Sequence, residues 1–577
     1  MWKLLKLARP FRGQVALVMV LALAQSLGNL YLPRLMAEVV DDGIVKGDTA
    51  AILRNGGGML LMALASTACA IAVAYFSARI ASAFARVVRG EVFTRVTRYS
   101  IHQFDQFSTA SLITRTTNDT AQVQQVLITA LNMAITAPMM GIGGIILSVQ
   151  QDAGLASVLI VVVPVMATVF MLIMRGAVPL FEVMQTRIDR LNLVIAEGLS
   201  GVRVIRAFDR GEHQHGRFDQ ANTATMDTAV SVNRIMAFLM PSMMILLNVT
   251  SIALVYVGGR RIASGSMELG AMIASLQYAM QILFSVLMVA AMFIIFPRAS
   301  AAAKRINEVL DLHPSVGDPT TPAEPRHTNV RGRVEFENVS FQYPGAEEPA
   351  ISGISFSANP GEMTAIIGGT GSGKTTIAGL IPRFYDVTQG RVLVGGLDVR
   401  EWAVDELRGR IGYVPQKAVL FTGTVAENIR YGDDQASEER VRRAADVAQA
   451  MEFVSGLQGE FAAPIAQGGV NLSGGQKQRL SIARALVRDA DIYVLDDSFS
   501  ALDYATDARL RAALKTHTTN ATVIVVAQRI STVINADRIV VLDDGRVAGV
   551  GTHTELLARC SVYREIVESQ VNIEEVA

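Results

Sequence analysis

The stretch that decides the fold of the C-terminal half reads Gly368-Gly369-Thr370-Gly371-Ser372-Gly373-Lys374-Thr375. It fits the phosphate-loop pattern G-x-x-x-x-G-K-[S/T], and it has the required context: a strand-like run, 364–367, before it and a helical stretch that begins at Thr376 after it. Glycines let backbone N–H groups close around phosphates, and the helix start adds a favourable dipole. We predict that Lys374 neutralises phosphate charge and that Thr375 binds Mg²⁺.

The loop lies in a region, from Gly332 onward, where short β-branched runs alternate with charged helical stretches. This alternation predicts an α/β domain with a largely parallel sheet. The predicted strands are Val334–Phe341, Met363–Ile367, Ile411–Val414, Ile492–Leu495, Thr522–Val526 and Ile539–Leu542.

Two acidic residues, Asp496 and Asp497, directly follow one of these strands. A parallel strand delivers such carboxylates to one edge of the sheet. Taken alone, an apolar run that ends in two acids could be any strand exit. With the phosphate loop upstream, we expect Asp496 to be the acid on the Mg²⁺ side and Asp497 to face the attacking water.

A second anion cradle is predicted in the same domain, where residues 472–479 read Leu-Ser-Gly-Gly-Gln-Lys-Gln-Arg. The Ser-Gly-Gly turn opens a helix. Because one nucleotide does not need two cradles on one chain, the second one should serve a nucleotide held by another copy or by a partner. An ordinary glycine-containing N-cap is the alternative for this turn alone. The predicted contacts are Ser473, Gly474, Gly475 and Gln476.

The N-terminal half has a different character, which the average composition hides. The 577 residues are 51% hydrophobic and only 18% charged, whereas soluble domains carry about 25% charge. Equal numbers of acidic and basic residues give no argument for a nucleic-acid partner, and two cysteines cannot form a disulfide framework. The apolar residues gather in six windows without a charge: 15–32, 59–76, 126–147, 153–174, 235–257 and 271–296.

Each window has the roughly 20 residues that cross a bilayer as a helix. We therefore predict a polytopic all-α domain over residues 1–312, a proline-containing linker over 313–331 and the α/β domain over 332–577. Arginines concentrate between spans two and three and between spans four and five, so the N-terminus and both long loops should be cytoplasmic. The first window follows basic residues as a signal peptide would, but it is too long for one, and a retained span is the preferred interpretation.

These motifs together resemble the ATP-binding cassette (ABC) transporter family. The LSGGQ signature, the phosphate loop and the Leu-Asp-Asp strand, with six preceding spans, resemble a type IV ABC exporter half-transporter over essentially the whole chain. The resemblance implies ATP and Mg²⁺ as cofactors and an exporting dimer in the cytoplasmic membrane. It also implies three residue roles: Tyr343 stacks on adenine, Gln416 contacts Mg²⁺ and the membrane domain, and Asp503 belongs to the D-loop between the two nucleotide sites. By the same resemblance, coupling helices are expected near Ser108–Asp119 and Arg206–Phe218.

Two departures from the family pattern matter most. Asp497 stands where the family has a catalytic Glu, and Gln528 stands where it has the switch His. An Asp carboxylate lies about 1.5 Å, one C–C bond, further back than that of Glu, and a misplacement of about 1 Å can cost on the order of 100-fold in rate. Gln528 can donate a hydrogen bond toward a γ-phosphate but cannot carry charge. The segment Ile465–Gly469 also lacks the usual Glu-Arg of the X-loop.

These departures predict ATP and Mg²⁺ binding with slow hydrolysis at this chain's own phosphate loop. Because the signature is intact, the simplest interpretation is a heterodimer in which the partner supplies the catalytic Glu and His. A slow homodimer and an ATP-binding regulatory or gating subunit remain alternatives. A soluble ATPase with a membrane anchor would need only one or two spans.

The cargo is constrained only by what the spans lack. None of the six windows holds an acidic or basic residue, which favours an apolar or amphipathic substrate such as a lipid or a hydrophobic drug. The polar residues within them are expected mainly to form interhelical hydrogen bonds, and Pro138, Pro164 and Pro241 are expected to bend helices.

Overall fold

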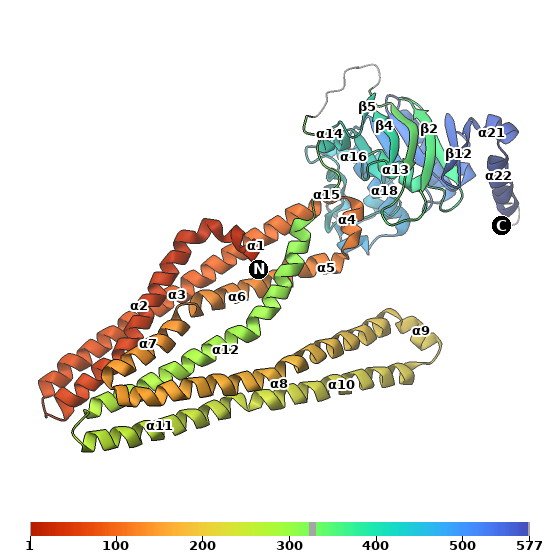
Figure 1. Ribbon diagram of the computed structural model, residues 1–577. Coiled ribbons are helices and arrows are strands. Elements are labelled where there is room, and N and C mark those ends of the chain that lie inside the picture. Colours follow the sequence, from red (N-terminus) through yellow and green to blue (C-terminus); the bar gives the residue numbers. More distant parts are fainter. Residues whose placement is uncertain (1, 322–330, 575–577) are drawn as a thin grey trace. The chain divides into compact units, whose positions relative to one another are not determined.

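The computed structural model describes residues 2–321 and 331–574. The chain forms two compact units (Figure 1). The N-terminal unit comprises Met1–Val96 and Thr109–Leu312, and the C-terminal unit comprises Thr97–Ser108 and His313–Ala577. Part of the predicted linker, 322–330, lies outside the described residues.

Six long apolar segments make up the N-terminal unit, and each is long and apolar enough to cross a membrane. The segments are 42 to 53 residues long, about twice what a bilayer core requires, so the helices continue well beyond the apolar windows. The prediction of a six-helix all-α domain is confirmed. Its principal helices are α2 (Arg12–Glu38), α3 (Thr49–Thr97), α6 (Thr120–Met133), α7 (Thr136–Gln151), α8 (Ala153–Ser200), α10 (Gly211–Ala237), α11 (Leu239–Ala263) and α12 (Leu269–Asp311).

Two of the apolar windows, expected as single helices, are interrupted. The window 126–147 breaks between α6 and α7, and 235–257 breaks between α10 and α11. In both cases a proline, Pro138 or Pro241, is the third residue of the second helix. Since proline has no N–H, the carbonyl four residues earlier loses its donor, whereas a proline in a first turn costs little. Pro164, by contrast, lies within the continuous helix α8.

Short segments connect these helices. α10 packs along α8, and α12 packs against α2, α6, α7, α8 and α11. The short elements of this unit are α1 (Trp2–Leu5), η1 (Lys6–Phe11), the π-helix η2 (Val39–Ile44), α5 (Thr109–Thr114), the π-helix η3 (Arg115–Asp119) and α9 (Val202–Ala207).

The C-terminal unit is built on two main sheets. A six-stranded sheet has the order β12-β11-β3-β10-β9-β6, in which only β12 is antiparallel to its neighbour. This confirms the expected α/β fold with a largely parallel sheet. Its strands are β3 (Met363–Gly368), β6 (Ile411–Val414), β9 (Ile492–Asp496), β10 (Thr522–Val526), β11 (Arg538–Asp543) and β12 (Arg546–Gly551).

The first predicted strand of this domain belongs to a separate sheet. β1 (Val334–Phe341) pairs antiparallel with β2 (Ile351–Ala358) and with β4 (Gln389–Val394), and β5 (Leu397–Asp398) completes the sheet. β1 alternates between buried and more exposed residues, the pattern of a sheet with one covered face, whereas β9 and β10 are buried throughout, as central parallel strands are.

Helices and one small hairpin complete this unit. The hairpin pairs β7 (Gly423–Thr424) with β8 (Pro464–Ile465). The helices are α4 (Ile101–Gln106), α13 (Lys374–Leu380), α14 (Val404–Gly409), α15 (Val425–Arg430), α16 (Glu438–Val447), α17 (Met451–Ser455), η5 (Glu460–Ala462), η6 (Gln467–Gly469), α18 (Gly474–Leu486), α19 (Tyr504–His517), α20 (Ile530–Val533), α21 (His553–Arg559) and α22 (Ser561–Glu574).

Candidate functional site

Four adjacent parallel strands converge on the site. In the order β3-β10-β9-β6 they run side by side, so their carboxyl ends lie at one edge of the sheet. The phosphate loop follows β3, the Gln528 segment follows β10, Asp496 ends β9, and Gln416 follows β6. The topology therefore brings together four motifs that lie up to about 160 positions apart in the sequence.

The phosphate loop has the backbone that its glycines permit. Gly371 and Gly373 have φ of +85° and +91°, and a Cβ on Gly373 would lie 2.4 Å from a side-chain carbon of Ile351. A Cβ on Gly371 would meet nothing within 4 Å, so the loop is open on that side. The geometry fits a loop that wraps around an anion.

Lys374 lies at the centre of this loop. Its Nζ donates to the carbonyl oxygens of Gly368, at 2.9 Å, and Gly369, at 2.6 Å. The residue is 8% exposed, and burial lowers the pKa of its ammonium group. A buried cation with only loop oxygens as hydrogen-bond acceptors is suited to take a phosphate as an additional partner.

Thr375 and Asp496 form the second contact of the site. The Thr375 hydroxyl donates to Asp496 Oδ1 at 3.2 Å, and burial of Asp496 raises the pKa of its carboxyl to about 6. Within the described residues, no cluster of three His, Cys, Asp or Glu side chains could hold a metal. One carboxylate and one hydroxyl fit Mg²⁺, which commonly takes one or two protein carboxylates and completes its shell with phosphates and water.

Asp497 is held by two side-chain amides. Gln416 Nε2 donates to Asp497 Oδ2 at 3.2 Å, and Gln528 Nε2 donates to the same oxygen at 3.0 Å. The backbone is fixed as well, because Asp497 N–H donates to the Val526 carbonyl at 3.0 Å and Asp497 has φ of +48°. Sequence reasoning selected these side chains separately but did not predict that the two unusual ones, Asp497 and Gln528, bind each other.

One residue near Gln528 was missed altogether. Gln570, on α22, hydrogen-bonds to the Gln528 carbonyl and to the Ile530 N–H. A glutamine in an amphipathic helix 42 positions away carries no sequence motif that could have singled it out.

Tyr343 lies beside the start of α13. Its hydroxyl is 3.0 Å from the Thr376 hydroxyl, and its ring meets those of Phe341 and Tyr385 edge to face. The side chain is half-buried, and stacking on adenine stays a prediction.

The LSGGQ segment forms a capped helix start. Ser473 Oγ accepts from Gln476 N–H and Gln476 Oε1 accepts from Ser473 N–H, the reciprocal pair of a capping box. A Cβ on Gly474 would meet nothing within 4 Å, and one on Gly475 would lie 3.1 Å from the Ala501 carbonyl. The capping bonds of this helix start are local, and the space beside Gly474 is open.

Asp503, expected in the D-loop, is the N-cap of α19. Its carboxylate accepts from the Thr506 N–H at 2.9 Å, and hydrogen bonds with Thr506 hold the pKa of this carboxyl below its usual range. The side chain thus has a local structural role in this structure.

The expected coupling segments can also be placed. Of Ser108–Asp119, only Ser108 belongs to the C-terminal unit, and residues from Thr109 onward belong to the N-terminal unit. Helix α4 is grouped with the C-terminal unit, and its Gln103 donates to the His313 carbonyl at 2.6 Å and accepts from the Ser315 N–H at 3.0 Å. A coupling role for Ser108–Asp119 and Arg206–Phe218 stays a prediction. Arg206–Phe218 covers the end of α9 and the start of α10.

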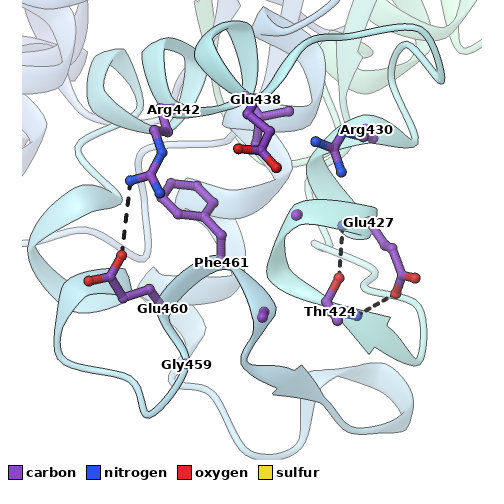
Figure 2. A pocket seen from close by; sticks show the side chains of 11 residues that line it. Thr424, Glu427, Arg430, Glu438, Arg442, Gly459, Glu460 and Phe461 are labelled. Carbon is purple, nitrogen blue, oxygen red and sulfur yellow. Dashed lines mark hydrogen bonds and ion pairs between the residues drawn. The ribbon is translucent and has the colours of Figure 1, made fainter.

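A separate polar pocket of about 420 Å³ lies between α15, α16 and η5 (Figure 2). Arg442 lies over the ring of Phe461, 4.8 Å from its centroid, and 3.9 Å from Glu460. Glu427 is bound to Thr424 within a capping box. No phosphate-loop or LSGGQ residue lines this pocket, so it is not part of the predicted nucleotide site.

Known proteins resemble the chain along its whole length. Residues 15–286 match the family of the ABC transporter transmembrane region, and residues 351–500 match the ABC transporter family. An ABC transporter ATP-binding protein of Mycobacterium tuberculosis is 45% identical over 97% of both chains. The ATP-dependent lipid A-core flippase of Chromobacterium violaceum is 31% identical over 92% of this chain and 91% of its own. A bacterial Atm1-family ABC exporter solved with ATP bound has a TM-score of 0.82 and 26% identity, covering 97% of this chain and 98% of its own.

Proposed function

The chain belongs to the ABC transporter family, and from this premise we propose that it is the degenerate-site subunit of a heterodimeric exporter. Members of this exporter class are multi-pass membrane ATPases that work as dimers. In the proposal, this chain binds ATP at its own phosphate loop but hydrolyses it slowly. Its LSGGQ segment, Leu472–Gln476, completes the nucleotide site on the partner, which contributes the catalytic Glu and His. The N-terminus and the nucleotide-binding unit face the cytoplasm.

The observation that carries this proposal is that two side-chain amides hydrogen-bond to the Asp497 carboxylate. A general base must reach the attacking water. The Asp497 side chain is shorter than that of Glu, and one of its carboxylate oxygens already accepts hydrogen bonds from two amides, Gln416 and Gln528. Neither amide changes charge between pH 5 and 8, as a histidine does. Nucleotide binding depends on other residues, Lys374 and Thr375. Lys374 lies against the phosphate loop and Thr375 against Asp496, so the substitutions at positions 497 and 528 do not alter these contacts.

The chemistry divides among the residues as follows. Lys374 and the loop N–H groups bind phosphate oxygens, Thr375 and Asp496 would hold Mg²⁺ with help from Gln416, and Tyr343 would stack on the adenine. The Mg²⁺ ion, when bound, supplies positive charge to the phosphates.

An apolar or amphipathic cargo is proposed on the basis of the membrane helices. A cavity of about 720 Å³ lies between α7, α8 and α12, and among the described residues that line it Ser285 has the only polar side chain. Such a lining offers no counter-charge to an ionic substrate. The similarity to a protein named a lipid A-core flippase supports a lipid-like cargo.

Asp497→Asn is expected to leave most of the ATPase activity of the assembled pair, because this site contributes little turnover. Replacing the partner's catalytic Glu by Gln should abolish it. Vanadate-sensitive ATPase is measured for this chain alone and together with the product of the adjacent gene. Loss of the pair's activity in Asp497→Asn would contradict the asymmetric assignment.

The same purification separates the alternatives. Robust activity only in the pair supports the exporter, and robust activity of the chain alone supports the homodimer. ATP binding without ATPase in either preparation would favour a regulatory or gating subunit. The intact LSGGQ segment favours the first outcome.

A further inference from the structure

One side chain of the last helix binds the backbone on both sides of Arg529, the residue that follows Gln528. Gln570 Nε2 donates to the Gln528 carbonyl at 2.8 Å, and the Ile530 N–H donates to Gln570 Oε1 at 2.8 Å. A primary amide has both a donor and an acceptor, and here each is used on the segment that follows β10. The position of this segment is thus tied to α22.

Helix α22 is itself anchored to the core of the C-terminal unit. Tyr563 is fully buried, and its hydroxyl lies 2.8 Å from His553 Nδ1. Ile566 packs against the same hydrophobic core. Since Tyr563, Ile566 and Gln570 are spaced i, i+3 and i+7, they share one face of the helix, and the packing that buries the first two also orients the third.

The segment that Gln570 holds leads directly to the candidate site. Gln528 is the residue whose carbonyl Gln570 binds, and the side-chain amide of the same residue donates to Asp497 at 3.0 Å. A shift of this backbone would therefore move the amide that faces the site. Figure 1 places α22 at the far C-terminal end of the chain, where no motif of the nucleotide site occurs.

We propose that Gln570 is a positioning residue that makes this chain's site distinguish ATP from ADP, by holding Gln528 where its amide reaches the γ-phosphate. The inference rests on the proposed nucleotide site at Lys374. ADP lacks the γ-phosphate, so the effect of Gln570 is confined to ATP. A general structural role would alter the affinity for both nucleotides alike.

The test compares Gln570→Ala with the unaltered full chain in equilibrium titrations with Mg·ATP and Mg·ADP. Gln570→Ala removes both hydrogen bonds to this segment, and the weaker positioning of Gln528 is expected to reduce ATP affinity about fivefold, with ADP binding unchanged. Gln570→Glu keeps the acceptor for the Ile530 N–H but places a carboxylate oxygen against the Gln528 carbonyl, and it should lose at least as much ATP affinity. Ser569→Ala is the matched control, because within the part of the chain that the structure describes the Ser569 hydroxyl bonds only to the Ile566 carbonyl of its own helix.

A double-mutant cycle tests the route through Gln528. If Gln570 acts through that side chain, Gln570→Ala should have little further effect on ATP affinity in a Gln528→Ala background. Equal losses for ATP and ADP, an unchanged ATP affinity in Gln570→Ala, or additive effects in the cycle would each overturn the inference. Lys374→Ala tests the proposed nucleotide site separately from the role of Gln570. If ATP binding survives Lys374→Ala, the proposed nucleotide site itself is wrong.

Discussion

Asp497→Glu combined with Gln528→His is expected to restore hydrolysis at this chain's site by about 100-fold, the order of rate that an error of about 1 Å removes. The measurement is made in the assembled pair whose partner carries Gln in place of its catalytic Glu, so that only this chain's site can turn over. The longer side chain advances the carboxylate by about 1.5 Å. The imidazole can carry a charge that the Gln528 amide cannot. Replacing Gln528 also removes one of the two amide hydrogen bonds that the carboxylate at position 497 accepts in the unaltered chain.

Each single substitution should restore less than the double one, because Asp497 and Gln528 bind each other and their effects are coupled. Asp497 has φ of +48°, a region where Asp is more common than most residues, so the unfolding midpoint of Asp497→Glu is measured as a control. The double variant is compared with the unaltered chain, both paired with the inactivated partner. If the double variant folds and binds ATP but hydrolyses it no faster than the unaltered chain, these two residues do not limit hydrolysis.

The sequence was most informative where a pattern is local. The spans could be predicted because a membrane helix must satisfy its backbone internally and cover itself with apolar side chains. The phosphate loop could be predicted because its glycines and lysine are adjacent in the chain. Pro138 and Pro241 lie just after helix breaks, whereas Pro164 lies in a continuous helix. Which of these outcomes a proline produces depends on the neighbouring turns, and the sequence alone left this open.

Contacts between distant segments were not predictable in the same way. The two amides on Asp497 come from loops after β6 and β10, and they meet it only because β9 lies between those strands. The grouping of α4 with the C-terminal unit depends on the backbone of His313 and Ser315, which Gln103 binds. Backbone acceptors and donors have no sequence signature, so these contacts of α4 could not be predicted from the sequence.

The second large effect is expected at an ion pair in the N-terminal unit. Asp119, at the end of the π-helix η3, has a side chain only 1% exposed, and Arg305 on α12 binds both of its oxygens, at 2.8 and 2.5 Å. Neither residue lies in an apolar window. A carboxylate is costly to bury without a partner. This pair therefore connects η3, which leads into α6, to α12, the last helix of the unit.

Arg305→Ala should destabilise the N-terminal unit by about 2–3 kcal/mol, since it leaves the buried Asp119 carboxylate without its partner, although the Arg305 side chain is itself 44% exposed. The measurement is the unfolding midpoint of the full chain in detergent. The exposed pair Lys3–Asp311, with side chains 66% and 55% exposed, is the matched control: Lys3→Ala should cost less than about 1 kcal/mol. The double variant Asp119→Leu with Arg305→Met should recover most of the loss, because it removes the charge that Arg305→Ala strands. If Arg305→Ala unfolds like Lys3→Ala, the buried carboxylate has another source of compensation, and the pair does not hold these two helices together.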